Sequence, residues 1–202
     1  MLYERWRKIS LERRNELALH DFTSRRRWTY AELFAGGETW RTGAGEIAFP
    51  QGQSPEFILD LLAAWRENKV ACPLDAQAAP SISSPPKNCA HLKSTSATGG
   101  AAHWVAFTAE QLAADAENIV ATMGLRPDWP NLGVISLAHS YGFSNLVFPL
   151  LLHGIPLILA PAPLPEMVRQ AAATAPAITL AAVPAMWRAW HQAGAIPPHV
   201  QL

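Results

Sequence analysis

The chain of 202 residues is half hydrophobic, has 16% charged side chains and carries a formal net charge of zero. This composition excludes a disordered chain, and no excess of charge favours nucleic acid or an acidic membrane as a partner. Two cysteines are too few for a disulfide scaffold and are typical of the reducing cytoplasm. Residues 1–14 are charged throughout, so we expect no signal peptide.

Basic side chains concentrate at the start of the chain. Residues 1–43 hold nine of the sixteen, including the run from Arg25 to Arg27. Acidic residues are interspersed among them, which favours a solvated surface with ion pairs. A docking face for an acidic partner is the alternative interpretation.

The predicted elements alternate between strands and helices. Thr29 with Glu32, and Thr108 with Gln111, have the spacing of capping boxes, so each pair predicts a helix start. Gly124 predicts the end of the second helix. The expected elements, in chain order, are a strand or turn at 28–30, a helix from 30 to about 34, a strand over 47–49, a helix over 54–68, strands over 70–74, 90–94 and 104–107, a helix over 108–123, a strand over 132–137, a turn at 139–142, a helix over 143–152, a strand over 155–159, a helix over 167–174, a strand over 178–182 and a helix over 184–191.

This alternation predicts an α/β fold with a mostly parallel sheet flanked by helices. Residues 76–92 are rich in Ala, Ser and Pro and predict a linker between a first subdomain, 1–75, and a second, 93–202. The most apolar stretch, 143–160, is interrupted by Asn145 and other breakers, so it predicts a buried core and no membrane span.

A run of small and hydroxylated residues between two predicted strands is the first candidate ligand site. Its hydroxyl and backbone N–H groups are donors that can surround a phosphate, and its glycines permit close approach. An ordinary turn is the alternative, because the Gly-Lys-Ser/Thr ending of a Walker loop is absent. The run is Thr95-Ser96-Ala97-Thr98-Gly99-Gly100.

Two further segments follow predicted strands. The first, His139-Ser140-Tyr141-Gly142, stands at the carboxyl end of a strand, where open α/β sheets bind ligands. A satisfied core histidine is the alternative interpretation of His139. The second, Val183-Pro184, is also interpreted as a simple helix start. No Gly-x-Ser-x-Gly elbow indicates a hydrolase, and no Cys/His spacing indicates a metal site.

Together these segments resemble the adenylate-forming superfamily of AMP-forming acyl-CoA synthetases, fatty-acid and aryl-acid ligases and adenylation domains. In that family a hydroxyl-rich glycine loop holds the ATP phosphates, a Pro-x-x-His-x-x-Gly segment borders the acyl pocket, and a Val-Pro turn follows. The matching segments here are Thr95–His103, Ser136–Gly142 and Val183-Pro184, preceded by Trp28–Leu33 and Phe57–Asp75. The resemblance extends along nearly the whole chain from about residue 17.

The resemblance implies the amino-terminal portion of an AMP-forming carboxylate ligase with a partial, truncated amino-terminal-domain fold. It implies ATP and Mg²⁺ as cofactors, a carboxylic acid as substrate, and coenzyme A or an acyl carrier protein as acceptor. It assigns no catalytic residue and no metal ligand to this chain. The residues it implies are Thr95, Ser96, Thr98, Gly99, Gly100 and His103 at the ATP phosphates, and His139, Ser140, Tyr141 and Gly142 at the acyl pocket.

The sequence also departs from the family pattern. Ala97, Gly99, Ala102 and His103 stand where the family has glycine, threonine, proline and lysine. Loss of a permanently charged lysine predicts nucleotide binding weakened by about tenfold or more. Later family motifs fall beyond residue 202, so we expect no activity from this chain alone, and a homo- or hetero-oligomer that covers the truncated sheet. A non-catalytic relative that binds a partner protein is the alternative.

Overall fold

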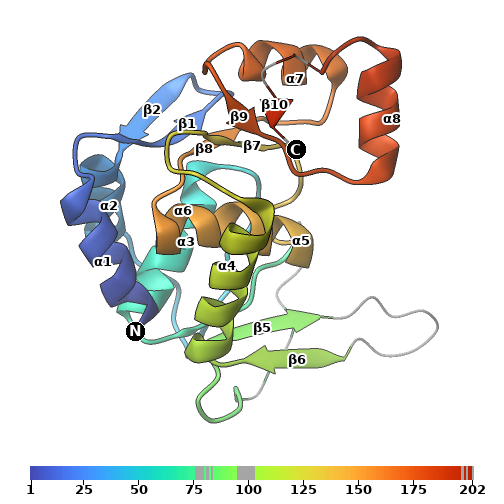
Figure 1. Cartoon of the computed structure of the whole chain (residues 1–202). Helices are drawn as coiled ribbons and strands as arrows, with labels where there is room; N and C mark the ends of the chain where they lie inside the picture. The colour runs from blue at the N-terminus through green and yellow to red at the C-terminus, as the bar shows by residue number, and fades with distance from the viewer. Residues whose placement is uncertain are drawn as a thin grey trace.

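The computed structural model describes residues 1–75, 80, 82, 84–94, 103–196, 198, 200 and 201. Within this part, helices surround two separate β-sheets (Figure 1). The helical segments are α1 (Leu2–Glu12), α2 (Tyr30–Thr39), α3 (Pro55–Arg66), α4 (Ala109–Met123), α5 (Ser140–Gly142), the π-helical turn η1 (Phe143–Val147), α6 (Phe148–His153), α7 (Pro165–Ala172) and α8 (Pro184–Gln192).

The larger sheet has the strand order β10-β9-β7-β8-β1-β2, and the smaller one has the order β3-β4-β5-β6. The β1–β2 and β5–β6 pairs are antiparallel and the other pairs are parallel, which confirms the predicted α/β class with a mostly parallel sheet. The strands are β1 (Leu17–Asp21), β2 (Arg26–Thr29), β3 (Ile47–Ala48), β4 (Val70–Ala71), β5 (His91–Ser94), β6 (Trp104–Phe107), β7 (Asn131–Gly133), β8 (Leu157–Leu159), β9 (Ile178–Thr179) and β10 (Val200–Gln201).

Both predicted capping boxes are present. The Thr29 backbone N–H donates to Glu32 Oε2 at 2.7 Å, and Glu32 N–H donates back to Thr29 Oγ1 at 3.2 Å. Thr108 and Gln111 form the same reciprocal pair at the start of α4. Gly124 ends α4 in the left-handed conformation, with φ of 61°, as its position predicted.

Helix α2 continues to Thr39, beyond the predicted end near residue 34, although it contains two glycines. A Cβ atom on Gly36 would lie 3.0 Å from Leu59 Cδ2, and one on Gly37 would lie 3.3 Å from Leu62 Cβ. The glycines therefore let α2 pack closely against α3, which offsets their low helix propensity.

Helix α1 and strand β1 were not predicted from the sequence, and both belong to the core. Trp6 of α1 and Leu19 of β1 are completely buried. Strand β1 lies beside β8 in the larger sheet, with Leu19 opposite Leu157. The sheet therefore joins segments that are about 140 positions apart in the sequence.

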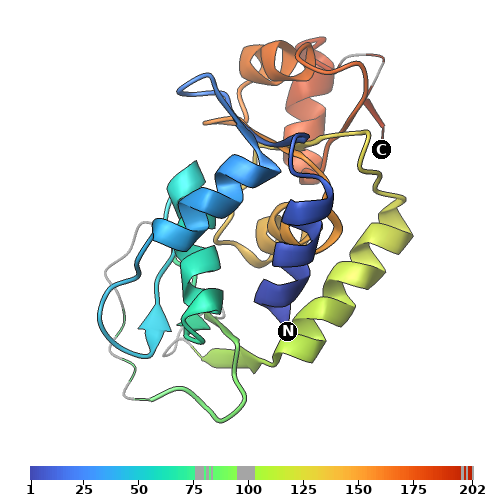
Figure 2. The same ribbon diagram turned by 90° about the vertical axis from the view of Figure 1, so that its left-hand side faces the viewer.

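The predicted helix over 143–152 forms as η1 followed by α6, and the predicted turn at 139–142 is wrong in part, because residues 140–142 already form a helical turn. Helix α6 packs against both α1 and α4 (Figure 2). Residues 146–152 are buried, so the apolar stretch is core as predicted. No helix in the described ranges combines the length and apolarity that crossing a bilayer requires.

Both sheets take strands from each side of the predicted linker. Strands β1 and β2 join β7 to β10 in the larger sheet, and β5 and β6 join β3 and β4 in the smaller one. The sheets therefore do not divide the chain at residues 76–92, six of which lie outside the described residues. Separate subdomains over 1–75 and 93–202 stay a prediction.

Candidate functional site

The carboxyl ends of strands from both sheets meet through one side chain. Gln53 lies in the loop between β3 and α3, and its Nε2 donates to the Ile135 carbonyl at 2.9 Å. Its Oε1 accepts from the Leu137 backbone N–H at 3.0 Å. The Gln53 side-chain amide thus bonds the backbone after β7 in the way a neighbouring strand would. It thereby holds the edges of the two sheets together.

A second contact joins the loop after β4 to the same segment. Ser136 Oγ donates a hydrogen bond to the Asp75 carboxylate, and it accepts one from the Ala138 backbone N–H at 3.2 Å. Asp75 follows β4 in the same way that Gln53 follows β3. The loops after β3, β4 and β7 are therefore linked at one edge, where ligands of open α/β sheets bind.

The segment from His139 to Gly142 presents polar groups from this edge. His139, Ser140 and Tyr141 are exposed, and Tyr141 retains 36% of its accessible surface. Tyr141 N–H donates to His139 Nδ1 at 3.2 Å, so the imidazole caps α5. The interpretation of His139 as a buried core histidine is therefore wrong.

Gly142 is buried in this segment and leaves no space for a side chain. A Cβ atom at this position would lie 2.0 Å from the Ser136 carbonyl oxygen. The glycine has an ordinary backbone conformation, with φ of −69°. It is required here because two backbone segments approach closely. Its place beside an acyl pocket stays a prediction.

The π-helical turn η1 follows directly. Asn145 Nδ2 donates to the Tyr141 carbonyl at 2.8 Å, and Asn131 Nδ2 donates to the Asn145 carbonyl at 3.1 Å. Both asparagines are buried, and they fix the exposed segment to β7. Single π-helical turns are frequent at functional sites because they redirect side chains from the helical spacing.

Strands β5 and β6 flank the predicted phosphate loop. The loop residues Thr95, Ser96, Thr98, Gly99 and Gly100 lie outside the described residues, and their predicted role stays a prediction. His103 is described: it is exposed and immediately precedes β6. Ser94 pairs with Trp104, so His103 lies across from the carboxyl end of β5.

Lys93, near the carboxyl end of β5, was not predicted as a site residue. Its ammonium nitrogen lies 5.4 Å from the centre of the Phe143 ring and 5.7 Å from that of Phe107. Burial lowers the pKa of Lys93, while Asp115 acts in the opposite direction. The lysine therefore brings a partly desolvated positive charge to the strand that enters the predicted loop.

The buried histidine of this region is His91. It is 0% exposed, its ring centre lies 4.5 Å from that of Phe143 with the rings tilted, and neither ring nitrogen has a hydrogen-bond partner among the described residues. Burial, followed by the charge of Lys93, lowers the pKa of His91 to about 3. His91 is thus a neutral packing residue under the candidate site.

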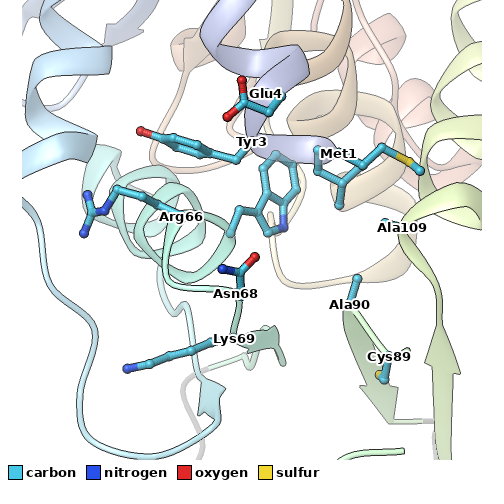
Figure 3. Close-up of a pocket in the computed structure, with 11 residues that line it drawn as sticks. Met1, Tyr3, Glu4, Arg66, Asn68, Lys69, Cys89, Ala90 and Ala109 are labelled. Atoms are coloured by element: carbon cyan, nitrogen blue, oxygen red, sulfur yellow. The ribbon is translucent and has the colours of Figure 1, made fainter. Parts of the chain in front are cut away.

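A separate cavity of about 350 Å³ lies at the opposite, amino-terminal edge of the smaller sheet (Figure 3). Arg66, Asn68 and Lys69 precede β4 along its wall, and Cys89 and Ala90 precede β5. Its two cations already have structural partners. Arg66 bonds the Trp40 carbonyl at 2.7 Å and Glu67 at 3.0 Å. Lys69 bonds Thr42 Oγ1 at 2.6 Å and Glu67 at 3.0 Å.

The third predicted segment, Val183-Pro184, begins α8 with Pro184 at the first helical position. This geometry agrees with the simple interpretation of a helix start. No cluster of three or more His, Cys, Asp or Glu side chains with metal-binding geometry occurs in the described ranges. Cys72 and Cys89 are both free thiols.

The strand order defines a mixed, mostly parallel α/β fold whose loops are linked at the carboxyl edges of the strands. No protein-family model and no curated protein sequence matches the chain. Solved structures do match it. MatB from Rhodopseudomonas palustris superposes with a TM-score of 0.80 at 17% identity, over 100% of this chain and 53% of its own.

Two further structures show the same fold. The o-succinylbenzoate coenzyme A synthetase MenE from Bacillus subtilis, in complex with AMP, has a TM-score of 0.80 at 16% identity, over 98% of this chain and 65% of its own. The N-terminal domain of FACL13 from Mycobacterium tuberculosis has a TM-score of 0.79 at 16% identity, over 95% of this chain and 65% of its own. The chain therefore spans between half and two thirds of the length of these structures.

Proposed function

We propose that the chain is the amino-terminal portion of an AMP-forming carboxylate ligase. The complete enzyme would join a carboxylic acid to AMP and transfer the acyl group to coenzyme A or an acyl carrier protein. The fold supports this proposal, because it matches MatB and MenE along almost the whole chain. The same fold can support different reactions, so the function is inferred from the residues of the site.

The observation that carries the proposal is the linkage of loops at the carboxyl edge. Gln53 and Asp75 hold the segment after β7, while His139 and Tyr141 remain exposed beyond it. Gln53 and Asp75 fix the backbone of this segment, while its polar side chains stay exposed. Such an arrangement is a preorganised surface for a ligand. Strand β5 ends and β6 begins at this same edge of the smaller sheet, on either side of the predicted phosphate loop.

In this proposal the segments 95–103 and 136–142 each bind one part of the ligand. ATP would supply the adenylyl group, and Mg²⁺ would accompany the nucleotide. The proposed phosphate-binding residues are Thr95, Ser96, Thr98, Gly99, Gly100 and His103, and the proposed residues at the acyl pocket are His139, Ser140, Tyr141 and Gly142.

Calorimetric titration with ATP and Mg²⁺ tests the proposal, and His103 provides the sharpest variant. His103→Lys restores a permanent charge at an exposed position, and about tenfold tighter binding is expected from one charge-assisted hydrogen bond. His191→Lys is the matched control, because it adds the same charge at an exposed position on α8. Equal tightening by both variants, or no binding by any of them, would contradict the proposal.

The exposed His103 in place of lysine also favours a second candidate function, a non-catalytic partner-binding protein. An imidazole gives phosphate less stabilisation than the permanently charged ammonium group of a lysine. A wild-type dissociation constant below about 100 μM, or about −5.5 kcal/mol, would exclude this candidate. Binding that appears only in His103→Lys would favour it.

We also propose that this chain alone does not complete adenylation, which requires both partners of the reaction to be positioned in a closed site. The assay is carboxylate-dependent exchange of labelled pyrophosphate into ATP. The purified chain should give the background rate with any acid supplied. Exchange that depends on the acid would show that these 202 residues are sufficient.

A further inference from the structure

A cavity of about 580 Å³ lies at the carboxyl ends of β1 and β8, away from the segments assigned above. Phe22 and Arg25 line it from the β1–β2 turn. Met167 and Gln170 line it from α7, where their spacing of three places both side chains on one helical face. Figure 1 shows the β1–β2 hairpin and α7 at the same end of the molecule.

His20 lines this cavity and has a polar atom without a partner. The residue is 7% exposed, and its buried Nδ1 has no hydrogen-bond partner among the described residues. The Phe22 ring stands against the imidazole at 5.9 Å and an interplanar angle of 65°. A buried polar atom without a protein partner can be satisfied by a ligand or water, and His20, unlike His91, lines a cavity that could hold one.

The cavity also carries a cation that has no counter-ion. Arg25 is exposed at φ of 59°, in the left-handed region, and forms no hydrogen bond or ion pair within the described residues. The acidic groups nearby are occupied. Asp21 accepts from Thr23 N–H at 3.0 Å and from Ser24 Oγ at 2.5 Å. Glu166 of α7 bonds Gln170 at 2.7 Å and also pairs with Arg169.

The cavity beside Arg66 and Lys69 differs in this respect, because its cations are bonded to carbonyls, Thr42 and Glu67. A free arginine beside an unsatisfied imidazole favours a negatively charged ligand with hydrogen-bonding atoms. The half-buried Phe22 and Met167 favour an apolar body attached to that charge.

We propose that this cavity binds a small organic anion, a carboxylate or phosphate on an apolar body. The anionic group of the ligand pairs with Arg25, and a polar atom of the ligand forms a hydrogen bond with His20. The apolar part of the ligand packs against Phe22 and Met167. The proposal is independent of the proposed ligase function, because it shares no residue with the segments 95–103 and 136–142.

An amide NMR titration of the whole chain tests this proposal with benzoate and phenyl phosphate as probes and benzyl alcohol as the uncharged analogue. Both anions should give saturable shifts at the amides of Phe22, Met167 and Gln170. The apparent affinity of the alcohol, fitted from the same amides, should be at least tenfold weaker. Shifts confined to Tyr141 would place benzoate at the other site and overturn the proposal.

Three variants complete the test. Arg25→Asn removes the charge while keeping a residue that tolerates left-handed backbone, so the hairpin is retained. It should weaken both anions about tenfold, whereas Arg25→Lys should recover most of the affinity. Arg14→Asn removes an exposed arginine elsewhere and should change nothing. Equal affinity of wild type and Arg25→Asn, or equal loss in Arg14→Asn, would overturn the proposal.

Discussion

The two edges of the smaller sheet use polar residues in opposite ways. At the amino-terminal edge, Arg66, Glu67 and Lys69 bond to one another or to nearby carbonyls and hydroxyls. At the carboxyl edge, Gln53 and Asp75 fix a segment whose polar tips remain exposed. Polar groups at the amino-terminal edge are therefore satisfied within the fold, whereas the carboxyl edge combines fixed residues with exposed polar groups that can meet a ligand.

The largest effect should come from filling the close contact at Gly142. A Cβ atom there would lie 2.0 Å from the Ser136 carbonyl oxygen, so the backbone must move. Gly142→Ala should lower the free energy of unfolding by about 3 kcal/mol, measured by urea denaturation. Gly43→Ala is the matched control, since no atom lies within 4 Å of its Cβ position, and it should change stability by less than about 0.5 kcal/mol.

Removing the amide that joins the two sheet edges should have the next largest effect. Gln53→Ala leaves the Leu137 N–H and the Ile135 carbonyl without their partner. We expect a loss of about 2 kcal/mol in the free energy of unfolding. Gln192→Ala, at the exposed end of α8, should leave stability unchanged. If the two variants unfold alike, Gln53 does not hold the edges together.

The contribution of the amino-terminal edge to stability should depend on pH through Glu67. A hydrogen bond from Thr42, followed by Lys69 and Arg66, lowers the pKa of Glu67 from 4.5 to about 2. A lowered folded-state pKa gives stability that is complete above about pH 4.5 and is lost as the pH falls toward 2. With its side chain 22% exposed, the contribution is about 1 kcal/mol.

The variant that isolates this contribution is Glu67→Gln, compared with Glu46→Gln at an exposed position. Unfolding free energies between pH 2 and pH 6 should depend less steeply on pH in Glu67→Gln than in wild type. Glu46→Gln should follow the wild-type curve. Parallel curves for all three proteins would contradict a structural role for the carboxylate.

The smallest effect is expected from the exposed part of the carboxyl edge. Ser140 is exposed, and no hydrogen bond from its hydroxyl is found within the described residues. Ser140→Ala should therefore change the free energy of unfolding by less than about 0.5 kcal/mol. A larger loss would mean that the exposed polar groups of this edge also serve stability, and the contrast between the edges would weaken.

Local features of the fold were predictable from the sequence, whereas long-range ones were not. The capping boxes at Thr29 and Thr108 involve neighbours three positions apart, so spacing alone indicates them. Helix α1 was missed because charged residues surround its buried Trp6, and β1 was missed because the buried His20 interrupts an apolar pattern. The neighbour of β1 in the sheet is set by tertiary packing.

In the candidate site, too, local features were predictable from the sequence and long-range contacts were not. The segment from His139 to Gly142 was found because it follows a predicted strand. Gln53 and Asp75 were missed because their partners lie more than 60 positions away in the sequence. Strand β7 ends at Gly133, short of the predicted residue 137, and the segment that follows bonds to Gln53. No local pattern reports such a contact.

Amide NMR mapping of an ATP and Mg²⁺ titration is the measurement that tests the contrast between the edges most directly. We expect saturable shifts in the segments 95–103 and 136–142, with the amides of Arg66, Lys69 and Cys89 unchanged. Shifts that concentrate at Arg66, Lys69 and Cys89, with residues 136–142 unaffected, would contradict this expectation.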